Sequence, residues 1–215
     1  MSTRRLITER DVRRAAKDGA RQLEIGDGVV TPSARDVAGS LGIELTRGAP
    51  APADAKSATP SAAAMGQILP IAIGADHGGV ALKEAIANRL RELGHSLTDV
   101  GTSGSAAVDY PDFAVAVANA VASGQARAGI MVDGAGIGSC MAANKVRGVR
   151  AAMCYDVTTA QNAREHNNAN VLTLGGGLIG ARLALAIVET FLATDFGGGR
   201  HASRVAKIDA LDGAR

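Results

Sequence analysis

The sequence predicts a Rossmann-like α/β protein: a three-layer α/β/α domain around a five-stranded parallel sheet, preceded by a small, mainly helical N-terminal extension. Three observations predict this fold class. Short aliphatic runs alternate with segments of helical spacing through residues 67–215. These runs are apolar throughout, which is typical of parallel strands that helices cover on both faces. A segment rich in Ala, Pro and Ser, residues 49–66, separates this region from residues 1–48.

Composition limits the classes of function. A chain of 215 residues has room for one ordinary α/β domain and a small attachment. Apolar residues make up 47%, and the core must be aliphatic because aromatic residues are only 2%. The formal charge of +2 and the lack of a nucleic-acid-binding motif argue against a nucleic-acid partner. Without an 18-residue apolar run or a signal peptide, and with cysteines in apolar surroundings, we expect a cytoplasmic protein with reduced thiols and no membrane partner.

The first 48 residues read as a compact extension with two helices. Thr8 is placed to cap a helix whose third residue is Asp11. Thr31, followed by a proline, begins a second helix that runs to about Leu41 and ends at Gly42. Fewer than 50 residues make a marginal domain. We therefore interpret residues 1–48 as a docking element, with an accessory extension that has no partner as the alternative. Residues 49–66 carry no large apolar residue and are predicted to be a flexible linker.

In residues 67–215, strands are predicted at 69–74, 96–100, around Ile130, 149–153 and 171–174. Helices are predicted at 80–93, from Pro111 onward, from Asp156 to about Glu165, and at 179–192. Ligands of such sheets bind at the carboxyl ends of the strands, near the topological switch point.

The strand around Ile130 leads into the most informative loop of the chain. Asp133 ends the strand, and Gly134, Gly136 and Gly138 follow on alternate positions before a helical segment of small residues. Glycines allow backbone N–H groups to converge, and the helix start adds its positive dipole end, so the loop can hold an anion. Asp133 is placed to act as a base. The loop lacks the Lys-Ser/Thr of a Walker loop, and its third glycine comes too early for a dinucleotide fingerprint.

Other polar clusters fall in loops where a ligand is expected. Asp76 and His77 follow the first strand and can contact a sugar hydroxyl and a phosphate; Asp76 as a plain helix cap is the alternative. Tyr110 follows Asp109, itself a possible cap, and can close over a ligand.

Two further clusters lie late in the chain. His166, beside Asn167, has a side chain suited to proton transfer, although a surface histidine at a helix C-terminus is the alternative. Arg200 and Arg204 share a face if helical and can grip a phosphate; a solvated basic tail is the alternative.

Together these clusters make residues 69–212 resemble the type B ribose-5-phosphate isomerase family, which includes galactose-6-phosphate isomerase subunits. Their order and spacing run through the whole domain. The matching segments are Gly74-Ala-Asp-His-Gly-Gly79, Asp109-Tyr-Pro111, Gly134-Ala-Gly-Ile-Gly138, Ala142-Ala-Asn-Lys145, Arg164-Glu-His-Asn-Asn168, Asn170-Val-Leu172 and Gly198-Gly-Arg-His201.

The resemblance implies an aldose–ketose isomerase that converts a sugar phosphate, such as ribose 5-phosphate, through an enediolate. It implies no metal and no cofactor, and a homodimer or tetramer whose active sites are shared between subunits. His166 would open the sugar ring with help from Asn167, and the amides of Gly134 to Gly138 would hold the enediolate oxygen. Substrate contacts would come from Asp76, His77, Tyr110, Asn144, Arg200 and Arg204.

The chain differs from the family pattern at four positions. Asp133 stands where many members have a catalytic cysteine, and Ser139 where others have a glutamate. Ala135 replaces a usual Thr or Ser, and Gly177 replaces a common arginine. We interpret Asp133 as the base and Cys140 as the reserve candidate, with a packing role as the alternative for Cys140.

Two alternatives to an isomerase follow from these differences: a phosphosugar-binding protein of the same fold without catalysis, and a nucleotide-binding α/β protein. The extension itself, through residues 5–12 and 30–36, is similar to extensions on enzymes associated with bacterial microcompartments. That similarity implies docking to shell or cargo proteins, and a location inside such a compartment.

Overall fold

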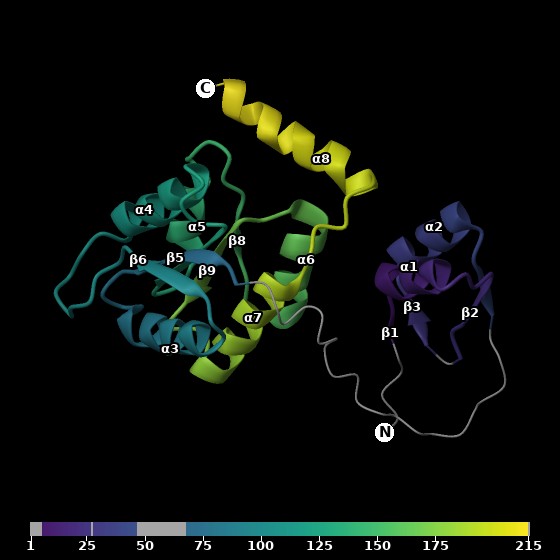
Figure 1. The fold of residues 1–215 in the computed structure, drawn as a ribbon, viewed down its shortest axis with the longest axis horizontal. Helices are drawn as coiled ribbons and strands as arrows, with labels where there is room; N and C mark the ends of the chain where they lie inside the picture. Colours follow the sequence, from purple (N-terminus) through teal and green to yellow (C-terminus); the bar gives the residue numbers. More distant parts are fainter. Residues whose placement is uncertain (1–5, 27, 47–67, 215) are drawn as a thin grey trace. The chain divides into compact units, whose positions relative to one another are not determined.

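The computed structural model describes residues 6–26, 28–46 and 68–214, and divides the chain into two compact units, Met1–Ala58 and Thr59–Arg215 (Figure 1). The predicted linker, residues 49–66, lies outside the described residues, so the predicted domain boundaries stay a prediction. No helix of the described residues is long and apolar enough to cross a bilayer.

The N-terminal unit is built from two copies of the same β–α–β order. The first copy is β1 (Leu6–Ile7), α1 (Glu9–Lys17) and β2 (Gln22–Glu24); the second is β3 (Val29–Val30), α2 (Pro32–Leu41) and β4 (Glu44–Thr46). Corresponding strands pair in parallel, β1 with β3 and β2 with β4. Both predicted helices are confirmed. The sequence did not reveal the strands, because two or three residues are too few to show a period.

Both helices of this unit begin after a threonine N-cap residue. Thr8 and Asp11 form the predicted capping box at α1, with the Thr8 amide donating to Asp11 Oδ2 at 2.8 Å. At α2, Thr31 Oγ1 accepts from the Ala34 amide, and Gly42 ends the helix with a φ of 67°. The helices pack over a small core of buried aliphatic side chains: Ile7, Val12, Val30, Ala34, Val37, Ala38 and Ile43.

The C-terminal unit has the predicted five strands and the helices between them. The strands are β5 (Pro70–Ala75), β6 (Ser96–Asp99), β7 (Ala128–Asp133), β8 (Ala151–Met153) and β9 (Val171–Gly175). The helices are α3 (Val80–Glu92), α4 (Tyr110–Ala122), α5 (Ile137–Ala143), α6 (Val157–Asn167), α7 (Ala181–Ala193) and α8 (Arg200–Asp209), followed by a 3₁₀ turn, Ala210–Ala214.

The five strands form one parallel sheet in the order β6-β5-β7-β9-β8. The chain moves outward from β5 to β6, then returns to the other side of β5 to form β7. Strand order therefore reverses between β5 and β7, and the crevice at their carboxyl ends is where ligands of open parallel sheets bind. The loops at that point begin at Asp76 and Gly134.

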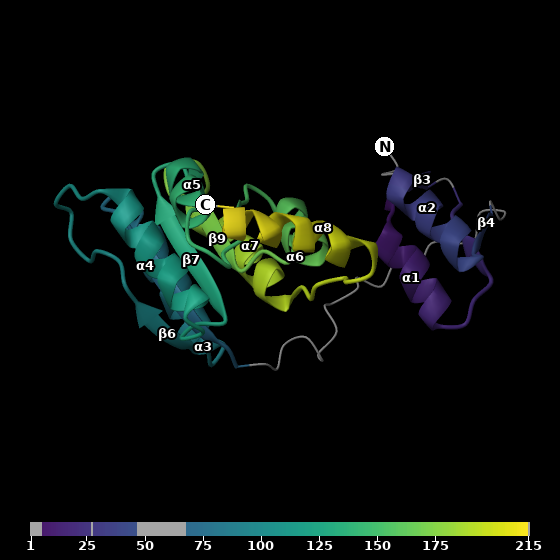
Figure 2. The same ribbon diagram turned by 90° about the horizontal axis from the view of Figure 1, so that it is seen from above.

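Helices cover both faces of the sheet, which confirms the predicted three layers (Figures 1 and 2). On one face, α3, α6 and α7 pack over β5, β7 and β9 through residues such as Ile86, Leu172 and Phe191. On the other, α4 and α5 bury small side chains such as Ala114 and Val117. The small side chains let these two helices lie close to the strands, as an aliphatic core with few aromatic residues requires.

One buried charge ties α3 to the loop after β6. Lys83 is 2% exposed, and its Nζ donates to both carboxylate oxygens of Asp99 at 2.9 and 2.7 Å and to the Thr102 carbonyl at 2.9 Å. The Asp99 side chain is 38% exposed. The pair therefore joins an ammonium that cannot reach water to a carboxylate that can. The loop that leads to Tyr110 begins directly after Asp99.

This asymmetry predicts unequal costs for the two deletions. Asp99→Ala strands a buried ammonium and should lower the free energy of unfolding by about 3 kcal/mol, whereas Lys83→Met leaves a hydrated carboxylate and should cost roughly 1 kcal/mol. Urea unfolding of both variants measures the difference. A larger cost for Lys83→Met would show that the ammonium is not the group that depends on the pair.

Candidate active site

Three loops approach one another closely at the carboxyl edge of the sheet. A Cβ atom on Gly79 would lie 2.2 Å from the Val132 carbonyl oxygen, and one on Gly175 would lie 2.8 Å from the Ala135 carbonyl oxygen. Gly177 donates its amide to the Gly134 carbonyl at 3.0 Å. The loops after β5, β7 and β9 thus pack backbone to backbone, which glycine alone permits at Gly79.

The Asp133 carboxylate organises the glycine loop that follows it. It is 4% exposed, and its Oδ1 accepts from the Ala135 amide at 2.9 Å and from the Gly136 amide. Its Oδ2 accepts from the Ser139 amide at 3.2 Å and from the Ser139 hydroxyl. Four donors fill the lone-pair positions that a carboxylate offers. Asp133 therefore holds the loop in shape.

This arrangement changes how the loop can hold an oxyanion. The Gly136 amide, predicted to face the substrate, donates to Asp133 in this structure. Ile137 and Gly138, in the first turn of α5, make no amide hydrogen bond among the described residues, so they remain as donors at the positive end of the helix. Which amides contact a substrate stays a prediction, as does the role of Asp133 as a base.

Asp76 and His77 lie beside this loop, after β5. Asp76 is 7% exposed, and its Oδ1 accepts from the amides of Gly78 and Gly79 at 2.9 and 3.0 Å. His77 is exposed, and its Nδ1 accepts from the Val108 amide at 3.3 Å. That bond connects the imidazole to the loop before α4, which carries Tyr110.

Tyr110 lies against the glycine loop. A Cβ atom on Gly138 would be 2.5 Å from the Tyr110 ring and hydroxyl. The phenol is 40% exposed, so it can still meet a ligand. Asp109 is the N-cap residue of α4, but its side chain makes no capping hydrogen bond. The structure thus gathers Asp76, His77, Tyr110 and the Asp133 loop at one edge of the sheet.

His166 and Asn167 lie at the opposite edge. Helix α6 begins after the carboxyl end of β8 and runs back over about 16 Å. It ends beside the start of β8, where Arg150 Nε donates to the Asn168 carbonyl at 2.9 Å. The strands are parallel, so the end of α6 is separated from the glycine loop by the length of the sheet. One chain does not bring the two predicted halves of the site together.

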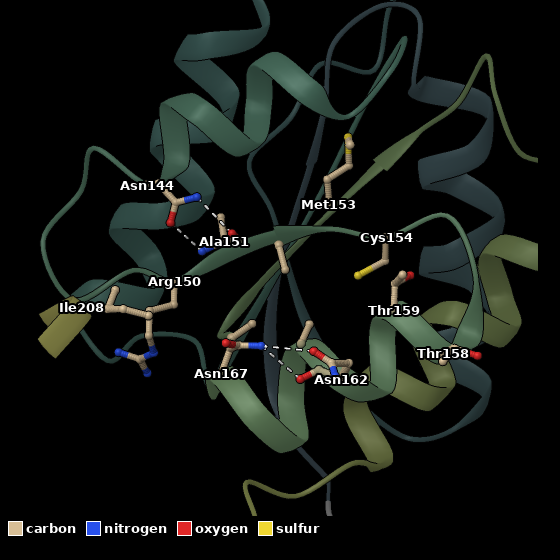
Figure 3. A pocket seen from close by; sticks show the side chains of 13 residues that line it. Asn144, Arg150, Ala151, Met153, Cys154, Thr158, Thr159, Asn162, Asn167 and Ile208 are labelled. Carbon is tan, nitrogen blue, oxygen red and sulfur yellow. Dashed lines mark hydrogen bonds between the residues drawn. The ribbon is translucent and has the colours of Figure 1, made fainter. Parts of the chain in front are cut away.

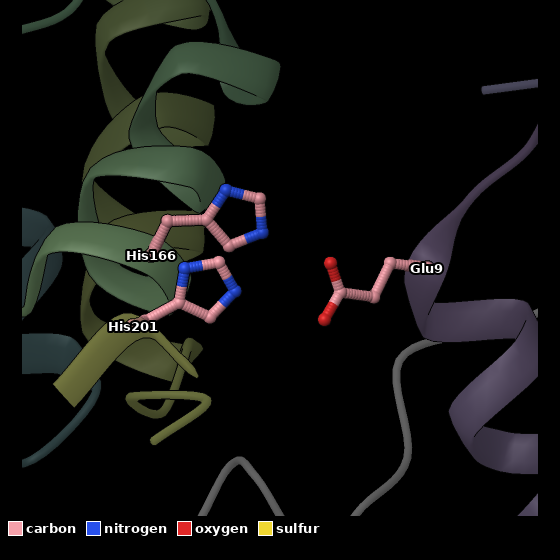
Figure 4. Close-up of side chains that lie close together, drawn as sticks. All are labelled: Glu9, His166 and His201. Atoms are coloured by element: carbon pink, nitrogen blue, oxygen red, sulfur yellow. The ribbon is translucent and has the colours of Figure 1, made fainter. Parts of the chain in front are cut away.

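Helix α8 belongs to this second group. The Gly197 amide donates to the Glu165 carbonyl at 2.8 Å, which places the start of α8 next to the end of α6. The His201 ring stacks on His166 with centroids 4.2 Å apart and planes inclined by 6° (Figure 4). The predicted helix that carries Arg200 and Arg204 on one face is α8.

Asn144 and Cys140 face β8. The Asn144 amide donates to the Ala151 carbonyl and accepts from the Ala151 amide, both at 2.9 Å. Burial raises the pKa of the Cys140 thiol, whose Sγ lies 3.4 Å from the Ala151 carbonyl oxygen. Both side chains hold α5 to the sheet, and their predicted roles with substrate stay predictions.

A pocket of about 560 Å³ lies between β8 and α6 (Figure 3). It contains Asn167 but neither His166 nor the glycine loop. The residues that sequence reasoning missed here are Thr158, Thr159 and Asn162, which line the pocket from one side of α6. In the sequence, the one signal for this group was the position of Asn162, which lies one helical turn before His166.

Comparison with known proteins identifies the class. Residues 71–208 match the family model described as Ribose/Galactose Isomerase, so the chain belongs to this family. The structure of ribose-5-phosphate isomerase B from Clostridium thermocellum is 50% identical, with a TM-score of 0.67 over 67% of this chain and 98% of that one.

Two further proteins of this family bear on the substrate. Ribose-5-phosphate isomerase B from Mycoplasma genitalium, solved with bound ribulose-5-phosphate, is 40% identical, with a TM-score of 0.66 over 68% of this chain and 97% of that one. The D-erythrulose-4-phosphate isomerase of Pectobacterium atrosepticum is 43% identical over 66% of this chain and 93% of its own length. The chain is a sugar-phosphate isomerase of the type B ribose-5-phosphate isomerase kind.

The contact between Tyr110 and Gly138 predicts a coupled pair. Gly138→Ala should displace the phenol and raise KM about ten-fold, because a shift of about 1 Å at a positioning group costs that much or more. In a Tyr110→Ala background, the same substitution should add little, since no ring remains to displace. Steady-state kinetics of the four proteins measures the coupling, and additive effects would contradict the contact.

Proposed function

We propose that the chain interconverts an aldose phosphate and its ketose through an enediolate, at a site that two copies of the chain share. One copy supplies the glycine loop with Asp133, Asp76, His77 and Tyr110. The other supplies its His166, Asn167, Arg200 and Arg204. The observation that carries this proposal is the placement of these two groups at opposite edges of one sheet.

Within the shared site, the amides at the start of α5 hold the developing oxyanion, and arginines of α8 together with His77 hold the phosphate. Oxidation of one carbon matches reduction of its neighbour, so the reaction balances without a redox partner. Asp133 transfers the proton between C1 and C2. Its lone pairs are filled, but turning the Ser139 hydroxyl away from Oδ2 frees one of them without moving the backbone.

The relatives' names include a phosphopentose and a phosphotetrose, and these two classes of sugar differ in whether they can form a ring. Ribose 5-phosphate is a closed ring that must open before isomerisation. Erythrose 4-phosphate cannot close a five-membered ring, because the phosphate occupies the oxygen on C4. Either sugar class is compatible with Gly177, which places no side chain at the position of the common arginine.

A panel of phosphopentoses, phosphotetroses and phosphohexoses, assayed for aldose–ketose conversion, tests the proposed function. His166→Gln should lower kcat for ribose 5-phosphate about 100-fold or more, and kcat for erythrose 4-phosphate by only a few-fold, because only the first has a ring to open. Equal losses on both would contradict the ring-opening role. Saturable phosphosugar binding without turnover on any sugar would favour a binding protein.

Mixing two inactive variants tests whether the site is shared. Asp133→Asn and His166→Gln proteins, unfolded and refolded together at equal amounts, should recover about a quarter of wild-type activity, since half of the dimers are hybrids with one intact site each. Each variant refolded alone is the control. Hybrids that stay inactive would show that both groups act within one chain.

For the N-terminal unit, we propose a docking role. It has its own buried core, and Leu6 and Val29, which pair in register across β1 and β3, are 57% and 50% exposed. Two adjacent exposed aliphatic residues on a short sheet are suited to a protein partner. The partner class that fits the sequence resemblance is a shell or cargo protein of a bacterial microcompartment, which would place the isomerase inside that compartment.

A further inference from the structure

The His166 ring has a defined hydrogen-bond partner within α6. Asn162 lies one turn earlier on the same face of the helix, and its Nδ2 is 2.8 Å from His166 Nδ1. The His201 ring stacks on one face of the His166 ring, with the ring centroids 4.2 Å apart. Glu165 Oε1 lies 4.0 Å from the second ring nitrogen, Nε2. The His166 imidazole is therefore held at one face by the His201 ring and at its Nδ1 edge by the Asn162 amide.

The direction of the hydrogen bond follows from the amide of Asn162. Asn167 Nδ2 lies 3.3 Å from Asn162 Oδ1, so the oxygen end of that amide accepts from Asn167. The NH₂ end then faces His166. An amide NH₂ can only donate, so Nδ1 must accept, and in the neutral imidazole the proton resides on Nε2.

We propose that Asn162 is a positioning residue that fixes His166 as its Nε2–H tautomer, with the His201 stack fixing the plane of the ring. This inference rests on the proposed function, in which His166 takes part in ring opening. Ring opening breaks the bond from C1 to the ring oxygen and moves the proton of the anomeric hydroxyl to that oxygen. A neutral imidazole that donates through Nε2–H stabilises the charge that develops on the ring oxygen, as a neutral histidine does in other isomerisation sites.

The opposite tautomer would present a bare Nε2 lone pair to the same oxygen and repel it. The identity of residue 162 therefore sets which end of the imidazole can assist. Asn162→Leu removes the donor at similar volume, and Asn162→Asp reverses the polarity, because a carboxylate accepts from Nδ1–H.

Nitrogen NMR of the full-length protein labelled with ¹⁵N-histidine reads the tautomer directly, at a pH where the imidazole is neutral and with the His166 signal assigned by its loss in His166→Gln. Wild type should show the Nε2–H tautomer, Asn162→Leu a mixture, and Asn162→Asp mainly Nδ1–H. Gln161→Leu is the matched control: Gln161 is on the same turn but donates to Glu165 at 3.1 Å, and its loss should leave the tautomer unchanged.

Kinetics provides the second readout. Asn162→Leu should lower kcat for ribose 5-phosphate about five- to ten-fold, the effect of one ordinary hydrogen bond, with kcat for erythrose 4-phosphate unchanged. The proposal would be overturned if wild type showed the Nδ1–H tautomer. It would also be overturned if Asn162→Leu kept the tautomer of wild type unchanged. An equal loss of kcat on both sugars would overturn it as well. A protein without turnover on any sugar would overturn the proposed function instead, and the NMR result would still decide the tautomer.

Discussion

Close backbone packing at the carboxyl edge of the sheet is the constraint on which the rest of the site depends. The loops after β5, β7 and β9 approach to distances that exclude side chains at Gly79 and Gly175. Loops can approach this closely only where they present backbone alone. The result is a closely packed floor of backbone beside the crevice between β5 and β7, and the Tyr110 ring lies against it at Gly138.

Asp133 completes this floor. Where the sequence resemblance implies a thiol, a carboxylate brings two oxygens and four acceptor positions, and the loop amides and Ser139 use them. The carboxylate therefore gives the loop an internal brace, and in the proposed mechanism it is also the base. The two roles share one side chain, and the Ser139 hydroxyl is the donor that can turn away from it most easily.

The direction of α6 has the largest consequence for function. A helix that returns along a parallel sheet must end at the edge opposite to the one where it began, so His166 and the start of α8 are carried away from the glycine loop. A single copy of the fold thus keeps the two predicted groups of site residues apart. In the proposed function, pairing of two copies brings these groups together, and Asn162 and His201 orient the imidazole within each copy.

The sequence by itself determined the fold class, the boundaries of most helices and strands, and the polar residues that end the strands. Aliphatic runs, capping pairs such as Thr8 with Asp11, and glycines at helix ends act within a few residues and can be read locally. Only the tertiary structure decided which of those residues share an edge of the sheet. It also showed that Asp133 accepts from two of the amides predicted for the oxyanion, those of Ala135 and Gly136, that Asn144 binds β8, and that His201 stacks on His166. These contacts join segments distant in sequence, or depend on side-chain direction, and no local pattern encodes either.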